Sequence, residues 1–290
     1  MQTGNHFLRF PVSYVDCRTD SVKQKIMKKL VVSFALLLMA TALVAQKEGW
    51  TLHWSDEFNK NGLPDSTIWS FDTAGNAYGW GNNELQHYTA KKPANAWVKD
   101  GILKITARKE KAGGKNYTSA RLITKGKASF VYGRMEIRAK LPPGKGTWPA
   151  IWMLGENIGE VDWPTCGEID IMEHVGYEKD SIYGTIHSQT YNHVKGTQKT
   201  KAIFIKDPYT AFHVYAIEWT PDRMDFYVDD QLYNSVQNEH LTEKEWPFDK
   251  PFFFILNLAV GGNWGGKMGV DEKVFPATME VDYVRVYKKK

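Results

Sequence analysis

Short runs in which apolar and polar residues alternate recur along the chain, separated by turns rich in glycine and proline. Met135 to Leu141 is one such run, and Val281 to Tyr287 is another. A repeat of two residues is typical of strands with one buried face. Phe252 to Val260 is almost continuously apolar, which predicts a strand buried on both faces. The pattern therefore predicts an all-β domain, either a sandwich or a barrel, with short helical turns only near Leu241 to Trp246.

Residues 27–45 have the composition of a secretory signal sequence. Two lysines follow Met27, and an apolar run then extends to Val44. This run has the length of a signal core and is short for a membrane span, although a short membrane anchor is the alternative interpretation. We expect cleavage after Ala45, with Ala42 as the second choice. The sequence therefore predicts a periplasmic or secreted protein with no stable insertion in the membrane after cleavage.

Removal of this leader changes what the composition implies. Residues 1–26 are interpreted as an upstream extension from a start assigned too early, and residues 46–290 as a single domain. The leader holds six basic and two acidic residues of the chain's 37 and 33, so 31 of each remain. This balance gives no indication of a nucleic-acid partner and argues against a strongly anionic substrate. Of the two cysteines, Cys17 lies in the leader, so Cys166 has no intramolecular disulfide partner and is interpreted as a packing residue.

Three carboxylates lie within one apolar segment that reads as a strand, at Glu168, Asp170 and Glu173. Burying three negative charges is unfavourable, so a purely structural role is improbable on physical grounds. Glu168 and Asp170 share a face of a regular strand, whereas Glu173 would point to the opposite face. One extra residue, Ile171 or Met172, would form a β-bulge that returns Glu173 to the first face. Paired carboxyl groups of this kind are what the hydrolysis of a glycosidic bond requires, but their spacing along the strand does not distinguish retention from inversion.

The segment from Gly167 to His174 resembles the active-site signature of glycoside hydrolase family 16, in its laminarinase-like branch. The resemblance extends over roughly residues 50 to 287. Further segments that carry it, in chain order, are Trp80–Tyr88, Tyr132–Glu136, Trp148–Leu154, Gly184–His187, Asn257–Trp264 and Val281–Tyr287.

The resemblance implies a fold, a mechanism and a set of catalytic residues. The fold would be a jelly-roll sandwich of two curved antiparallel sheets with a substrate cleft across the concave face. The reaction would be a double displacement, with Glu168 as nucleophile, Glu173 as acid and base, and Asp170 supporting the nucleophile. The expected substrate is a β-1,3-glucan, with mixed-linkage β-1,3-1,4-glucan as a second substrate. Alternatives are a galactan such as agarose, a transglycosylase that uses a sugar acceptor, and a non-catalytic glycan-binding module. We expect a monomer.

Candidates for substrate binding are aromatic and polar residues near the carboxylate strand. Aromatic rings stack on the C–H faces of pyranose sugars, whereas Trp69 and Trp219 are interpreted as core residues. No zinc or iron site is evident in the sequence, and no cofactor is required. The substrate-binding candidates are Asn83, Glu84, Arg121, Trp148, Trp152, Trp163, His187 and Trp264.

A structural calcium ion on the convex side is a further implication of the resemblance. The matching positions are Glu57, the backbone carbonyl of Gly101, and Asp282. Oxygen ligands suit calcium. The sequence therefore gives a candidate calcium site, separate from the catalytic segment.

Overall fold

The structure is a computed structural model that describes Met1, residues 48–75 and residues 79–290. The predicted signal sequence at 27–45 lies outside the described residues, as do residues 2–26 of the predicted upstream extension. Helices are few and short in the described part of the chain, as the alternation of residues predicts: α2 (Ile158–Val161), η1 (Gly79–Asn83) and η2 (Glu272–Val274). None of the helices in the described residues is long and apolar enough to cross a membrane.

In the part of the chain that the structure describes, eighteen strands form two sheets. The first sheet contains, in spatial order, β16 (Gln231–Gln237), β15 (Arg223–Val228), β14 (His213–Trp219), β9 (Gly133–Lys140), β18 (Ala277–Lys289), β5 (Ile102–Ala112), β6 (Lys115–Ser119) and β3 (Gln86–Tyr88), with β1 (Trp50–Asp56) on β18 and β4 (Ala96–Lys99) on β5. The second contains β13 (Lys199–Phe204), β12 (Ser181–His187), β11 (Glu168–Glu173), β10 (Thr147–Gly155), β17 (Phe252–Val260), β7 (Arg121–Ile123) and β2 (Ser70–Phe71), with β8 (Ser129–Phe130) on β17.

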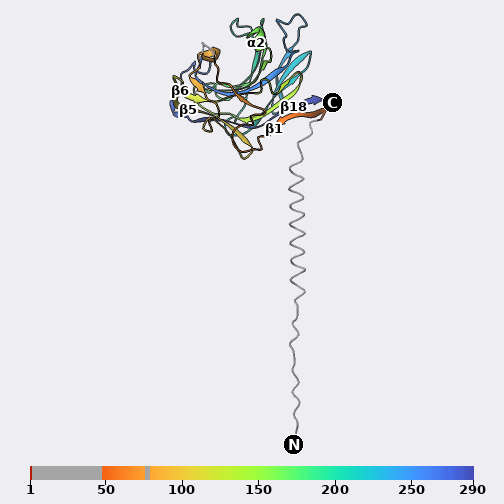
Figure 1. Cartoon of the computed structure of the whole chain (residues 1–290). Helices are drawn as coiled ribbons and strands as arrows, with labels where there is room; N and C mark the ends of the chain where they lie inside the picture. The colour runs from red at the N-terminus through yellow and green to blue at the C-terminus, as the bar shows by residue number, and fades with distance from the viewer. Residues whose placement is uncertain (2–47, 76–78) are drawn as a thin grey trace. The chain divides into compact units, whose positions relative to one another are not determined.

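Antiparallel pairing dominates both sheets, and among the described strands only β3 and β6 pair in parallel. Figure 1 shows β1, in orange, beside β18, in blue. Side chains from both sheets meet in one apolar core, for example Met135 and Ile137 from β9 with Ile169 from β11 and Leu256 from β17. The predicted β-sandwich is therefore present.

Burial follows the predicted pattern along β17 and departs from it along β9. All nine residues of β17 are buried, as its continuous apolar run predicts. On β9, however, the polar residues Arg134 and Glu136 are buried as well. Arg134 pairs with Glu136 at 2.6 Å and with Glu218 at 2.9 Å, and its guanidinium lies over the ring of Tyr227. A buried ion pair with several partners is tolerated where an unpaired charge would not be.

The remaining predictions about packing also hold. Trp69 and Trp219 are almost completely buried, which agrees with their interpretation as core residues. Around Leu241 to Trp246 the chain forms a single hydrogen-bonded turn, in which the carbonyl of Thr242 accepts from the amides of Glu245 and Trp246. That turn belongs to the connection between β16 and β17, to which we return below.

Candidate active site

β11 contains the predicted bulge, and the strand register identifies the extra residue. On the neighbouring strand β10, Met172 faces Ile151 and Asp170 faces Trp152. Because Ile151 and Trp152 are consecutive, Ile171 is the residue inserted between these two pairs. The pairing of β11 with β12 shifts at the same place. The sequence had left Ile171 and Met172 as equal candidates, and the register on β10 selects Ile171.

The bulge places all three carboxylates on one side of the strand. Glu168 and Glu173 are partly exposed on the outer face of the sheet, and Asp170 lies between them with 2% of its surface exposed. The residues between the carboxylates turn toward the core, where Ile171 and Met172 are both buried although they are adjacent in sequence. Two successive core-facing residues are what a bulge allows and a regular strand does not.

Two indole N–H groups hold the outer carboxylates in place. Trp163 Nε1 donates to Glu168 Oε2 at 2.9 Å, and Trp148 Nε1 donates to Glu173 Oε1 at 3.1 Å. An indole N–H is only a donor, and it favours the ionised form of the carboxyl group that accepts it. Each predicted catalytic glutamate therefore has its own tryptophan, from a different segment of the chain.

His187, at the end of β12, lies close to Asp170 and Glu168. Its Nε2 is 3.4 Å from Asp170 Oδ2 and 3.8 Å from Glu168 Oε1. The ring of Trp163 lies beside this histidine and is tilted against the ring of His193, with centroids 5.0 Å apart. The structure thus brings His187 to the carboxylates, as its place on the next strand predicted.

Burial raises the pKa of all three carboxyl groups. It raises the pKa of Glu173 to about 7, with the charge of Glu168 as a second cause. Asp170 has its pKa raised well above the usual range, by burial and by the charge of Glu173. The pKa of Glu168 is raised to about 8, first by burial and then by the charge of Asp170, while His187 and Trp163 oppose the shift. When Asp170 holds a proton its charge no longer acts on Glu168, so Glu168 can ionise beside a protonated neighbour.

Trp152 is fixed from beneath by a chain of buried polar side chains. Its Nε1 donates to Asn257 Oδ1 at 2.7 Å, and Asn257 Nδ2 donates to the hydroxyl of Tyr88 at 3.0 Å. The Tyr88 hydroxyl in turn donates to Glu84 Oε2 at 3.4 Å, where Gln86 Nε2 also donates at 2.5 Å. Because the indole can only donate, the amide of Asn257 has a single orientation and the chain ends on the acceptor Glu84.

Arg121 lies between two aromatic rings next to this chain. Its guanidinium is 4.8 Å from the ring centroid of Trp80 and 4.8 Å from that of Trp152. Its Nε donates to Asp72 Oδ2 at 3.1 Å, so charge and stacking both fix its position. On β17, Asn257 faces Arg121 on one side, and on the other it faces Ala150, which faces Glu173. Arg121 and Glu173 are thus linked by successive cross-strand pairs, and Arg121 lies three strands away from Glu173 in the same sheet.

The remaining predicted binding residues lie in two places. Trp264 packs edge-on against Trp148, which bonds Glu173, and against Tyr183. Asn83 is exposed, and its Nδ2 donates to Asn263 Oδ1 at 3.0 Å. Its sequence neighbour Glu84 is instead buried in the chain described above. The two residues predicted together are therefore in different environments, one at the surface and one beneath the aromatic groups.

Comparisons with known proteins agree with this geometry. A sequence model of glycosyl hydrolases family 16 matches residues 82–285. The chain belongs to this family. It is 51% identical over 276 residues to a β-glucanase of Rhodothermus marinus, covering 91% of this chain and 96% of the relative.

Solved structures of the family match the fold as well as the sequence. The laminarinase from Rhodothermus marinus has a TM-score of 0.80 and 54% identity, over 83% of this chain and 98% of that one. A non-specific endo-β-1,3(4)-glucanase of family 16 has a TM-score of 0.80 and 48% identity, over 85% and 94% of the two chains. The predicted family, enzyme class and jelly-roll fold are thus confirmed.

Several residues of this family 16 site were missed by sequence reasoning. Asn257, Tyr88 and Trp80, which lies against Arg121, entered only as end residues of segments that carry the family resemblance. Asn257 could have been noticed as a polar residue in the otherwise apolar run of β17. Nothing in the local sequence indicates that Trp152 reaches it, because 105 positions separate the two residues.

A metal site was not expected near the carboxylates, yet potential ligands gather there. One ligand atom each from Glu168, Asp170 and His187 lies within 4.8 Å of the others, the one such group in the described part of the chain. The same oxygens belong to the predicted nucleophile and its support. The cluster therefore coincides with the predicted catalytic residues.

The calcium candidates converge on one stretch of β18. Asp56, which precedes Glu57, faces Val284, and Leu103, two residues after Gly101, faces Val281. Both segments thus flank Asp282. Glu57 accepts two hydrogen bonds from Arg285, at 2.8 and 2.7 Å, and Asp282 accepts one from Arg138 at 2.5 Å. Carboxylate and carbonyl oxygens are ligand types that suit calcium, and in this structure an arginine is bonded to each of the two carboxylates.

Cys166 is buried just before β11. It packs with Leu154, Phe253 and Ile255, in a small cluster separate from the main core. Burial, followed by the charge of Glu168, raises the pKa of its thiol to about 12. A thiol that stays protonated at neutral pH is a weak nucleophile, which agrees with the packing role predicted for it.

Proposed function

We propose that this protein is a retaining endo-β-1,3-glucanase that also cleaves mixed-linkage β-1,3-1,4-glucan. The observation that carries the proposal is the bulge at Ile171, which puts Glu168, Asp170 and Glu173 on one face beside two tryptophan N–H groups. The names of the two matched enzymes from Rhodothermus marinus and of the non-specific β-1,3(4)-glucanase support the same substrate class.

In the first step Glu168 attacks the anomeric carbon of the sugar. A covalent ester forms between the sugar and the carboxylate as the glycosidic C–O bond breaks. Glu173 gives its proton to the leaving oxygen, which departs as a hydroxyl group. The pKa of Glu173, raised to about 7 by burial, keeps this proton available near neutral pH.

In the second step the ester is hydrolysed. Glu173, now a carboxylate, takes a proton from water while the water oxygen attacks the anomeric carbon. The ester bond breaks and Glu168 is released as a carboxylate. Trp163 and a protonated Asp170 can both donate to that carboxylate, so they stabilise it as a leaving group. Two inversions give net retention at the anomeric carbon.

Aromatic and polar groups on both sides of the carboxylates would bind the chain of sugars. Trp152, Arg121 and Trp80 lie toward β7, and Trp163 with His187 lies toward β12. These groups extend across the strands, so a polysaccharide would cross the sheet roughly at right angles to β11. An enzyme with binding groups on both sides of its carboxylates would cut within a chain.

The test is the product profile of residues 46–290 on laminarin, lichenan, agarose and xyloglucan. Oligosaccharides of mixed length from laminarin and lichenan are expected, with the β-anomer appearing first by NMR. Cleavage of agarose alone would overturn the substrate, and first appearance of the α-anomer would overturn the double displacement. Longer products at high acceptor concentration would identify a transglycosylase, and binding without products would identify a glycan-binding module.

We propose further that the protein acts outside the cytoplasm as a monomer. The support is the signal-like composition of residues 27–45. Fractionation of expressing cells should place a shortened chain in the periplasm or medium, starting at Gln46. Light scattering of that chain should give the mass of one copy. A full-length chain in the membrane fraction would instead identify a membrane anchor.

A further inference from the structure

A pocket lies away from the carboxylates, between the loop that follows β16 and the turn between β14 and β15. Its volume is about 420 Å³, within the range of roughly 300–1,000 Å³ typical of small-molecule sites. None of the predicted catalytic or binding residues lines it. Its lining residues are Tyr132, Pro221, Asn238, His240, Leu241, Thr242, Glu243, Trp246 and Asp249.

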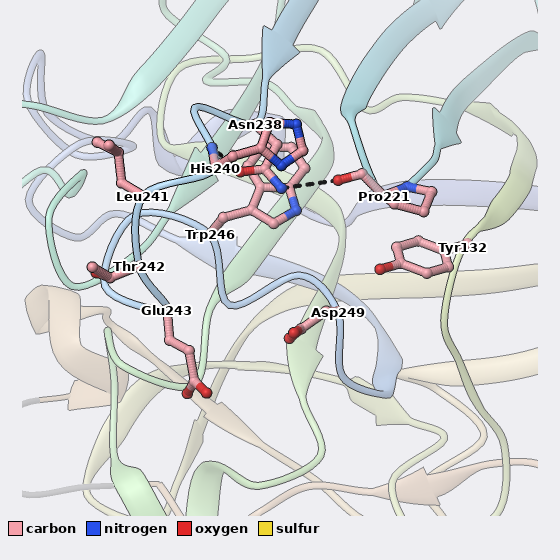
Figure 2. A pocket seen from close by; sticks show the side chains of 9 residues that line it. All are labelled: Tyr132, Pro221, Asn238, His240, Leu241, Thr242, Glu243, Trp246 and Asp249. Atoms are coloured by element: carbon pink, nitrogen blue, oxygen red, sulfur yellow. Dashed lines mark hydrogen bonds between the residues drawn. The ribbon is translucent and has the colours of Figure 1, made fainter.

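Trp246 lines this pocket with a polar group that needs a partner. Its residue is 93% buried, with a relative exposure of 7%, and its Nε1 has no hydrogen-bond acceptor among the described residues. Buried indole N–H groups normally have one. In Figure 2 the ring of Trp246 lies between Thr242 and Glu243 on the left and Tyr132 on the right.

The other groups of the pocket supply acceptors and a second aromatic ring. Tyr132 is close enough to Asp249 for that carboxylate, after burial, to raise the pKa of the phenol. Glu243 is paired with Lys250 at 2.6 Å, while Asp249 is exposed. The carboxylates disfavour an anionic ligand. A purely apolar ligand would leave the N–H of Trp246 without an acceptor.

A neutral sugar matches this combination of groups. Its ring oxygen or a hydroxyl can accept from Trp246, a hydroxyl can donate to Asp249, and its C–H face can pack on the ring of Tyr132. We propose that this pocket is a second carbohydrate-binding site, which holds glucosyl units of the β-glucan that the catalytic cleft cleaves. The choice of glucan rests on the proposed function.

The location of the pocket separates it from the cleft. The ring of Trp246 packs edge-on against Phe248, with centroids 5.1 Å apart. Gly167, the residue before Glu168, packs closely against Phe248 and Pro247. A Cβ atom added to this glycine would lie 3.3 Å from the Phe248 ring and 2.8 Å from Pro247. Phe248 thus lies between the pocket and the start of the catalytic strand. A second contact of this kind would raise the affinity for long chains more than for short ones.

The experiment measures binding to insoluble β-1,3-glucan with residues 46–290 carrying Glu168→Gln, which prevents turnover. Asp249→Ala and Trp246→Phe are introduced separately, and Gln237→Ala on the exposed side of β16 is the matched control. We expect about a tenfold or greater loss of affinity in the two pocket variants and none in the control. Asp249 is on the surface, so its variant remains informative if Trp246→Phe does not fold.

Turnover is measured in parallel with Glu168 intact. Asp249→Ala should cleave short soluble oligosaccharides of β-1,3-glucan within about twofold of the wild-type rate, because an exposed side chain outside the cleft contributes little there. Equal binding of insoluble glucan by Asp249→Ala and Gln237→Ala would overturn the second site. Failure of the proposed function would be seen separately, as absence of products from the wild-type enzyme.

Discussion

Trp163 donates its indole N–H to Glu168 at 2.9 Å, and this single bond ties a loop residue to the proposed nucleophile. Trp148 makes the equivalent contact with Glu173. Both tryptophans were predicted to stack on sugar, and their N–H groups also favour the ionised form of each carboxyl group. The two tryptophans are therefore expected to lower the pKa values of Glu168 and Glu173 as well as to shape the sugar-binding surface.

The pH profile of kcat/KM should respond differently to the two tryptophans. Glu168 must be ionised and Glu173 protonated, so activity falls at low pH as Glu168 gains a proton and at high pH as Glu173 loses one. Trp148→Phe removes a bond that lowers the pKa of Glu173, so the alkaline limb should move up by about one pH unit. Trp163→Phe should instead move the acid limb up, because Glu168 becomes harder to ionise.

The pH profile is measured on a soluble glucan, with circular dichroism to confirm folding. If both variants lowered the rate at every pH without moving either limb, the tryptophans would act only through sugar stacking. Because the carboxyl groups titrate together, each limb reports the whole cluster and not one residue.

Glu168→Gln should inactivate the enzyme and make it more stable at alkaline pH. Burial raises the pKa of Glu168 in the folded chain above its value of about 4.3 in an unfolded chain. The folded state then binds this proton more tightly, so the wild type loses stability as the pH rises above about 4.3. Glutamine removes that loss, with a gain in Tm of about 2–4 °C per kcal/mol recovered.

Thermal unfolding at pH 4 and pH 8 is the measurement. The gain should be present at pH 8 and nearly absent at pH 4. Glu160→Gln, on the exposed face of α2, is the control and should change Tm at neither pH. A Glu168→Gln variant no more stable than wild type at pH 8 would mean that burial does not raise the pKa of this carboxyl group.

Glu84 is expected to act as a positioning residue for Trp152. Glu84→Leu removes the final acceptor of the chain through Tyr88 and Asn257 and leaves buried donors unpaired, a loss of about 1–3 kcal/mol in stability. Because Arg121, which stacks on Trp152, lies three strands from Glu173, KM should rise more than kcat falls. Glu84→Gln, which retains an acceptor, should restore most of both.

Kinetics on oligosaccharides of increasing length test this role. The loss in kcat/KM for Glu84→Leu should be greater for substrates long enough to reach Arg121 than for the shortest ones cleaved. A loss independent of substrate length would indicate only a general effect on the fold.

The sequence predicted the fold class and the carboxylates because both depend on local pattern. Alternation of residues indicates strands, and the odd spacing of Glu173 from Glu168 requires a bulge if the two are to act together. Which residue forms the bulge depends on the partners of the strand. Ile171 and Met172 are both apolar, and only the register with β10 distinguishes them.

The supporting contacts could not be predicted because they join distant parts of the chain. Asn257 bonds Tyr88 across 169 positions and Trp152 across 105. The burial of Arg134 depends on Glu218, which lies on the neighbouring strand β14. In each case the sequence shows a polar residue in a strand, and the partner that permits its burial is brought there by the sheet.

Calcium should stabilise the protein through Glu57 and Asp282. Both carboxylates flank one stretch of β18, and Arg285 lowers the pKa of Glu57 against the effect of burial, so Glu57 is ionised at neutral pH. An ion that binds only the folded chain adds about 2.7 kcal/mol of stability at one hundred times its Kd.

We expect Tm to be higher in millimolar calcium than in EDTA for the wild type, and the two values to coincide for Glu57→Gln. Glu280→Gln, which alters another carboxylate of β18 paired with Lys140 at 3.0 Å, should keep the calcium response. Identical Tm values for the wild type in calcium and in EDTA would mean that Arg285 and Arg138 fill the role of the ion in this chain.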